Sequence, residues 1–153
     1  MSIASPDIIV VNSDGEYLIV VEAKLNSSSH QRAIEQLKHF MASVGCTFGL
    51  AVTGEQISLL RDSFEKFHGE SITVIGRARL PKHLLPPADG RWKENPYYEF
   101  ESQVQRWLEG LKLTPRLDIL PNDLKELFEE PIISLLQFGE IRAAGPRWSR
   151  VVS

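Results

Sequence analysis

The stretch that decides the fold is Pro6–Lys24, which reads PDIIVVNSDGEYLIVVEAK. Ile8–Val11 and Tyr17–Val21 are rich in β-branched and aromatic residues, which is typical of strands. Asp14-Gly15 lies between them, and this dipeptide is a strong signal for a tight hairpin turn. The sequence therefore predicts a β-hairpin.

The register of this hairpin brings three polar side chains together. If Asp14-Gly15 forms a two-residue loop, counting back along both strands places Asp7 opposite Glu22. Lys24 shares the face of Glu22, because side chains alternate along a strand. A four-residue loop keeps this arrangement and a three-residue loop breaks it. Facing carboxylates destabilise a strand pair, so a divalent cation is the expected compensation; the alternative is that these residues only mark solvated strand ends.

The same residues carry a motif. Pro6-Asp7, followed by Glu22-Ala23-Lys24 at the end of the next strand, resembles the PD-(D/E)XK nuclease superfamily. The chain is most similar in character to the N-terminal nuclease domains of type I restriction enzyme R subunits, over about residues 5–61. The resemblance implies a restriction-endonuclease-like α/β fold with a mixed central sheet flanked by helices. It also implies a phosphodiester hydrolase that acts on DNA and depends on Mg²⁺ or Mn²⁺.

The resemblance also implies roles for individual residues. Asp7, Glu22 and the carbonyl of Ala23 are expected to hold one or two metal ions, which polarise the phosphate and activate a water. Lys24 is expected to orient or help deprotonate that water, or to offset negative charge at the phosphate. Residues 36–40 (QLKHF) resemble the Gln-x-x-x-Tyr helix motif of several nuclease subfamilies, so Gln36 is expected to reach the active site or the phosphate backbone. A surface glutamine on a helix flank is the alternative.

Beyond the motif, helix and strand patterns alternate. A helix is expected over residues 29–44, ended by Gly45, and a buried strand over 47–53 that returns parallel to the Glu22 strand. Strands are expected over 56–61 and 71–75, with a short helix between them. Two amphipathic helices follow over 96–111 and 122–136; Pro131 is expected to kink or split the second, and a last strand begins near residue 140.

Basic residues give a second set of candidates. Residues 77–93 are rich in Pro and basic side chains, which predicts a long loop. The candidate DNA-binding residues are Arg32, Arg77, Arg79 and Lys82; a solvated loop is the alternative for those between 77 and 93. Arg142, Arg147, Trp148 and Arg150 in the tail are candidates for contact with nucleic acid or a partner subunit. We expect residues 1–80 to form the nuclease core and residues 81–153 an extension packed on it.

The start of the chain departs from the family pattern. Relatives usually have a helix, often with an acidic residue, and a strand before the Pro-Asp, whereas only six residues precede Asp7. We expect one of the two amphipathic helices, or a second copy of the chain in a homodimer, to cover the sheet instead, with Trp107 and Leu111 buried. Glu99 or Glu101 is a candidate to replace the acidic residue. The departure also supports an alternative function, a catalytically inactive module that binds nucleic acid or a protein partner.

Composition limits the class of protein. The chain has 153 residues, of which 42% are hydrophobic and 24% charged, as in a soluble single domain. Cys46 is the only cysteine, so no intrachain disulfide is possible and a reducing cytoplasm is expected. No stretch approaches the roughly 20 apolar residues that span a bilayer, and no signal peptide is evident. The net charge of −3 argues mildly against a protein that coats DNA.

Overall fold

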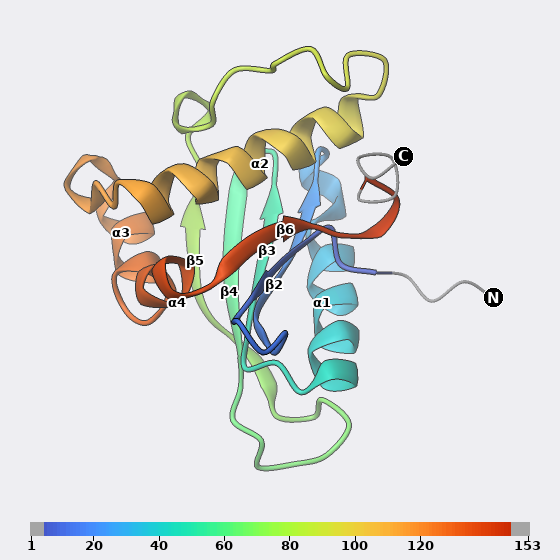
Figure 1. The fold of residues 1–153 in the computed structure, drawn as a ribbon. Helices are drawn as coiled ribbons and strands as arrows, with labels where there is room; N and C mark the ends of the chain where they lie inside the picture. Colours follow the sequence, from blue (N-terminus) through green and yellow to red (C-terminus); the bar gives the residue numbers. More distant parts are fainter. Residues whose placement is uncertain (1–4, 148–153) are drawn as a thin grey trace.

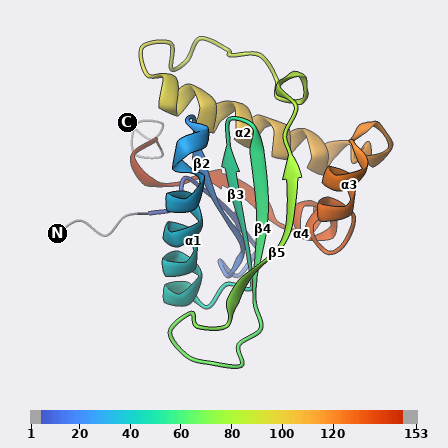
Figure 2. The same cartoon turned by 180° about the vertical axis from the view of Figure 1, so that it is seen from behind.

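The computed structural model describes residues 5–147. A six-stranded mixed sheet in the order β5-β4-β3-β2-β1-β6 forms the centre, with helices on both faces, so the expected α/β fold class is confirmed (Figures 1 and 2). The strands are β1 (Ile8–Val11), β2 (Tyr17–Lys24), β3 (Phe48–Thr53), β4 (Gln56–Asp62), β5 (Ile72–Arg79) and β6 (Glu140–Ala143). The helices are α1 (His30–Val44), α2 (Pro96–Leu113), α3 (Asn122–Glu129) and α4 (Ile132–Phe138), and short 3-10 turns lie at Ser27–Ser29, Lys82–Leu84 and Leu117–Ile119.

The hairpin has the predicted register but not the predicted turn. β1 and β2 pair antiparallel with Ile8 opposite Val21, as the two-residue loop requires. The loop is longer by one residue, because the Asn12 N–H donates to the carbonyl of Glu16 at 3.0 Å. Leu18 then forms a β-bulge, and this extra residue in β2 restores the register that the longer loop would have shifted.

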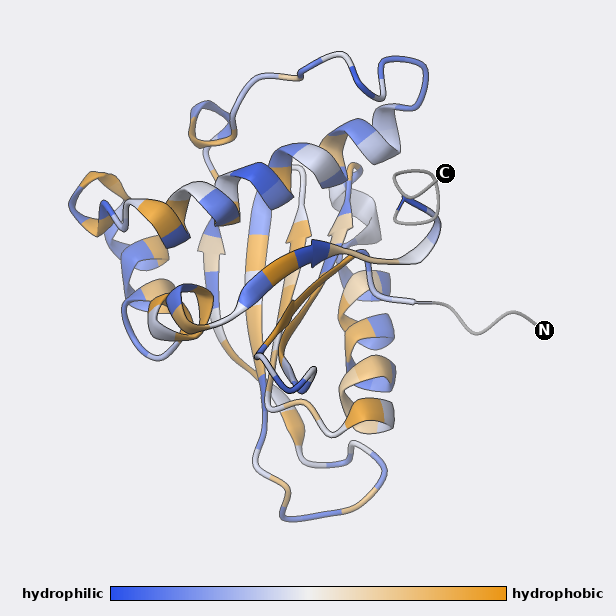
Figure 3. Cartoon of the chain, in the orientation of Figure 1, coloured by the Kyte–Doolittle hydropathy of each residue, from blue (hydrophilic) through white to orange (hydrophobic). Residues whose placement is uncertain are grey.

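The two faces of the sheet carry separate cores. α1 packs on β2 and β3, and its residues Ile34, Leu37 and Met41 meet Val20 and Ala51 of those strands. The opposite face, which carries residues such as Ile19 and Leu50, is covered by α2, α3 and α4. Successive side chains of β1, β2, β3 and β4 point into alternate cores, and because both faces are buried there, these strands are hydrophobic along most of their length (Figure 3).

α2 fulfils the expectation that an amphipathic helix covers the sheet. It runs across the strands in Figure 1 and is capped by Asn95, whose side chain accepts a hydrogen bond from the Tyr98 N–H at 3.1 Å. Trp107 and Leu111 are buried, as predicted. The Trp107 ring meets Phe128 of α3 edge to face, with 5.4 Å between centroids. The C-terminal half of the chain therefore supplies most of one core.

Three other expectations meet different outcomes. Residues 63–71 form a loop instead of the expected short helix, because Phe64 and His68 have φ of 59° and 60°. β5 continues to Arg79, so the first part of the segment predicted as a loop is strand. Pro131 separates α3 from α4, as predicted. No helix within residues 5–147 has the length and apolarity to cross a membrane, and Trp148 and Arg150 lie outside the described residues.

Candidate active site

Asp7, Glu22 and Lys24 meet at the end of β2. Lys24 Nζ lies 3.5 Å from Asp7 Oδ2 and 3.2 Å from Glu22 Oε2. The two acidic residues are almost fully buried, with 6% and 2% of their surface exposed, whereas the Lys24 side chain is 32% exposed. The structure therefore places all three side chains on one face of the sheet, as the hairpin register predicts.

Backbone groups hold the two carboxylates in place. The Ala23 N–H donates to Asp7 Oδ2 at 2.8 Å, and the Asp7 N–H donates to Glu22 Oε1 at 3.2 Å. Asp7 is further fixed between two strands, since its N–H also donates to the carbonyl of Val21 at 3.1 Å and its carbonyl accepts from the Ala144 N–H at 2.9 Å. The carboxylates are thus ordered by the sheet itself before any ligand arrives.

Burial makes both carboxyl groups resist ionisation. It raises the pKa of Glu22 to about 7, and the charge of Asp7 adds to this effect while Lys24 opposes it. Burial also raises the pKa of Asp7, against the influence of Lys24 and the Ala23 N–H. Burial lowers the pKa of Lys24, but the charges of Asp7 and Glu22 outweigh it, so the pKa of Lys24 is raised overall. Two buried, mutually repelling carboxylates are a site that a divalent cation would stabilise.

A buried ion pair adjoins these residues. Arg147, after β6, places Nε 3.4 Å from Oε1 of Glu101 on α2, and both residues are buried. Burial raises the pKa of Glu101 to about 8, and the charge of Asp7 adds to the effect. Of the two candidates for a replacement acid, Glu101 is therefore close enough for the charge of Asp7 to raise its pKa, but its carboxylate pairs with Arg147. Glu99 has two buried carboxylate oxygens that accept no hydrogen bond within the described residues.

Two carboxylates are available for a metal ion. Within residues 5–147, no group of three or more His, Cys, Asp or Glu side chains lies close enough to hold a metal. A cation bound by Asp7 and Glu22 would therefore complete its shell with the Ala23 carbonyl and water. Mg²⁺ accepts such a site, since it commonly takes only one or two protein carboxylates.

The comparisons with known proteins bear on this part of the chain. Residues 2–75 match the family described as type I restriction enzyme R protein N terminus. This stretch is similar to a restriction-enzyme domain. The match covers slightly less than half of the chain and includes Asp7, Glu22 and Lys24. No curated protein and no solved structure matches the chain.

Gln36 also lies in the restriction-enzyme-like stretch. It projects from α1 and is partly buried, and its Oε1 is buried without a hydrogen-bond partner in the described structure. No described hydrogen bond joins Gln36 to Asp7, Glu22 or Lys24, so its catalytic role stays a prediction. Arg32, one turn earlier on the same helix, is exposed.

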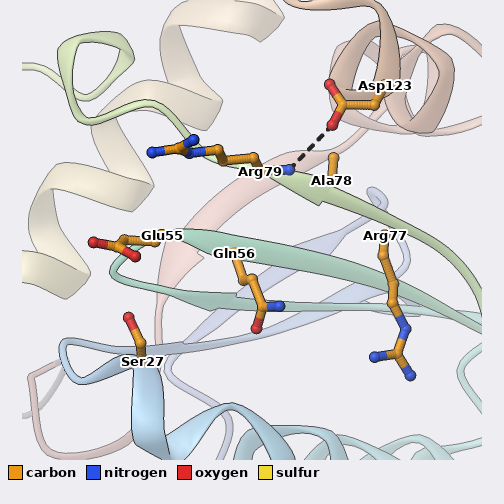
Figure 4. A pocket seen from close by; sticks show the side chains of 7 residues that line it. All are labelled: Ser27, Glu55, Gln56, Arg77, Ala78, Arg79 and Asp123. Atoms are coloured by element: carbon orange, nitrogen blue, oxygen red, sulfur yellow. Dashed lines mark hydrogen bonds between the residues drawn. The ribbon is translucent and has the colours of Figure 1, made fainter.

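The remaining DNA-binding candidates line two adjoining pockets. The first, which we call the Arg79 pocket, has a volume of about 600 Å³ and is lined by Ser27, Glu55, Gln56, Arg77, Ala78, Arg79 and Asp123 (Figure 4). In this view the side chain of Arg77 points away from that of Arg79, and the Arg79 N–H donates to Asp123 Oδ2 at 3.2 Å. The second, the Lys82 pocket, has a volume of about 430 Å³ and shares Ser27 and Glu55 with the first.

The position of Arg147 beside the acidic residues is not predicted by the sequence patterns. A signal for its partner was present, because Glu101 lies at helical spacing from the apolar residues Val104 and Leu108 and therefore falls on the buried stripe of α2. A carboxylate in that position requires a buried cation or a proton. The identity of this cation depends on which residue the fold brings to Glu101. That contact is made across the fold, so the sequence around Glu101 does not predict it.

Proposed function

We propose that this chain is a metal-dependent phosphodiester hydrolase that acts on DNA. The observation that carries the proposal is the contact of Lys24 with two buried, backbone-anchored carboxylates, Asp7 and Glu22. These residues lie in the stretch that is similar to the N terminus of type I restriction enzyme R proteins. Buried carboxylates with raised pKa values beside a lysine are a common signature of catalytic sites.

Each residue has a distinct part in the proposed reaction. Asp7, Glu22 and the carbonyl of Ala23 would hold Mg²⁺ or Mn²⁺. The cation, when bound, would polarise the phosphodiester and lower the cost of the charge that develops on it. Lys24 keeps its proton, because both carboxylates raise its pKa. It therefore acts as a cation that attracts and orients the phosphate in preference to acting as a base.

The neighbouring pockets give the DNA backbone a place to bind. The Lys82 pocket is lined by Leu25 and Asn26, which directly follow Lys24 at the end of β2. Lys82 in this pocket and Arg79 in the adjoining Arg79 pocket would contact phosphates. Phosphate contacts orient a duplex without reading its sequence, so this surface supports binding to DNA in general.

The test is a cleavage assay on plasmid and oligonucleotide DNA with Mg²⁺, Mn²⁺ or EDTA. The variants Asp7→Asn, Glu22→Gln and Lys24→Met should each lose cleavage by roughly 100-fold or more, and pairs of these changes should lose little further, since the three residues serve one step. Matched controls are Asp14→Asn on the hairpin turn and Lys38→Met on α1. Full activity of Lys24→Met would contradict the role of Lys24, and a wild-type protein that cleaves no nucleic acid would contradict the function itself.

A catalytically inactive binding module is the second candidate. It is favoured by one observation, that no third acidic side chain joins Asp7 and Glu22 among the described residues. Under this alternative, Lys24 is a permanent counter-ion for both carboxylates. Calorimetric titration with Mn²⁺ separates the two candidates, because the hydrolase should bind Mn²⁺ and lose this binding in Asp7→Asn. The binding module should instead bind DNA with the same affinity in Mn²⁺ and in EDTA.

A further inference from the structure

The proposed reaction leaves unused a second polar cavity, which we call the Trp92 cavity. It has a volume of about 580 Å³ and lies between α2, β6 and the segment that precedes α2. Four arginines line it: Arg91, Arg106, Arg142 and Arg147. The volume falls in the range of about 300–1,000 Å³ typical of sites for small ligands.

Two of these arginines have a buried Nε atom that forms no hydrogen bond within the described residues, although the Arg106 side chain is 30% exposed and its Nη2 donates to the Pro87 carbonyl at 2.8 Å. Arg147 is only 4% exposed; its Nη2 donates to Gln105 Oε1, while its Nε faces Glu101 at 3.4 Å without forming a hydrogen bond. Arg106 Nε is likewise buried without a hydrogen bond, although Asp89 lies 3.7 Å away. A buried guanidinium whose five N–H donors are incompletely used favours an anion that completes them.

The balance of charge in the cavity also favours an anion. The lining residues include four arginines and three acids, of which Glu140 pairs with Arg142 at 2.9 Å and Asp89 lies 3.7 Å from Arg106. Burial raises the pKa of Glu109, against the opposing charges of Arg147 and Arg106. Arg91 forms no ion pair within residues 5–147 and is exposed. The other three lining arginines pair with Asp89, Glu140 and Glu101, so among the described residues Arg91 is the lining arginine left to meet an anion.

An aromatic side chain completes the set. Trp92 lines the cavity and is held by Tyr98, whose ring it meets edge to face with 5.2 Å between centroids. Arginine side chains bind phosphate groups, and an indole ring stacks on a base. Together they recognise a nucleotide of a single strand. Inorganic phosphate would use only the arginines.

We propose that the Trp92 cavity binds one nucleotide of a single DNA strand, with its phosphate on the arginines and its base stacked on Trp92. Ala143 lines the cavity and pairs with Ile8 of β1, and the next residue, Ala144, donates its N–H to the Asp7 carbonyl. One strand thus joins the cavity to the carboxylates, so a nucleotide bound here lies near the reacting bond. The choice of a DNA strand as the source of the nucleotide rests on the proposed function.

The test measures binding of the full chain, in EDTA, to a fluorescent single strand of about 12 nucleotides by anisotropy. Trp92→Ala should weaken binding roughly tenfold, as expected for the loss of one stacked base. Arg142→Ala and Arg91→Ala should each weaken it roughly threefold. The matched control is Arg116→Ala, because Arg116 is exposed and pairs with Asp118 two positions away, as Arg142 pairs with Glu140. A deoxynucleoside monophosphate should compete at lower concentration than inorganic phosphate.

Two results would overturn the inference. One is an equal affinity for Trp92→Ala, Arg142→Ala, Arg91→Ala and Arg116→Ala, with unchanged thermal unfolding. The other is competition by the monophosphate no stronger than by phosphate. The cleavage assay separates this inference from the proposed function. If the wild type cleaves no nucleic acid but binds the strand through Trp92, only the hydrolase function is refuted. If it cleaves DNA but its binding does not depend on Trp92 and Arg142, only nucleotide binding in the Trp92 cavity is refuted.

Discussion

The burial of Glu22 makes the stability of the protein depend on pH. Burial and the charge of Asp7 raise its pKa from 4.5 to about 7, so between these values the folded protein holds a proton that the unfolded chain has released. The stabilisation from this proton is complete below pH 4.5 and is lost as the pH rises through about 7. Because one pKa unit corresponds to about 1.4 kcal/mol, the upper limit of the loss is about 3 kcal/mol.

Urea unfolding followed by tryptophan fluorescence, in EDTA between about pH 5 and pH 8, measures this loss. The wild type should be less stable at the higher pH. Glu22→Gln keeps the shape of the side chain but removes the titration, so it should reduce the difference by up to about 3 kcal/mol. Glu126→Gln, on the exposed side of α3, should keep the full wild-type difference.

Glu101 titrates over an overlapping range, because its pKa is raised to about 8, so some pH dependence should persist in Glu22→Gln. Mg²⁺ should stabilise the wild type more at the higher pH, since a cation favours the ionised carboxylates. An identical pH profile for Glu22→Gln and the wild type would refute the reasoning, and the electrostatic argument for a metal between Asp7 and Glu22 would fall with it.

Three further predictions concern the fold. Trp107→Ala should cost about 3–5 kcal/mol of unfolding free energy, since Trp107 packs on Phe128, and a cost below about 1 kcal/mol would show that α2 does not hold the sheet. Gly139→Ala should destabilise by more than about 1 kcal/mol, because its new Cβ would lie 2.6 Å from Val10 Cγ1. The control is Gly110→Ala in α2, whose Cβ would meet nothing within 4 Å and which should be neutral or stabilising. Equal costs for the two variants would contradict the packing around Gly139. His30 is buried between Thr53 Oγ1 at 2.8 Å and Ser58 Oγ at 2.7 Å, and burial with the charge of Arg77 lowers its pKa, so its stabilisation is present above its ordinary pKa of 6.5 and is lost as the pH falls. His30→Gln should therefore cost less at about pH 5 than at about pH 7.5, and a cost that is the same at both would refute the assignment.

The hairpin shows which parts of this fold local sequence could predict. β-branched runs on either side of Asp14-Gly15 identify two strands, and alternation then fixes which side chains share a face. The turn itself was wrong by one residue. The site residues nevertheless came together because Leu18 bulges out of the ladder, and nothing in the residue types around Leu18 marks a bulge.

The far end of the site could not be predicted in the same way. Residues 77–93 are predicted as a loop, yet β5 continues to Arg79. Within β5, a Cβ added at Gly76 would lie 2.3 Å from Leu127 Cδ2 of α3. Close packing of β5 and α3 therefore demands the glycine. Likewise, Arg147 reaches Glu101 only because β6 docks beside β1. Such contacts depend on tertiary packing. In a single sequence they leave a trace only where a residue breaks the local pattern, as Glu101 does among the apolar residues of α2.

The docking of β6 on β1 also sets when the backbone of Asp7 becomes fixed during folding. The Asp7 carbonyl accepts a hydrogen bond from the Ala144 N–H, near the opposite end of the described residues. Its other contacts, with Glu22, Ala23 and Lys24, lie within the hairpin. During synthesis the hairpin emerges from the ribosome well before β6 and Ala144. Closing so long a loop is slow compared with forming a hairpin. The nascent chain therefore carries Asp7 and Glu22 well before the segment after β6 fixes the backbone of Asp7 beside Glu22.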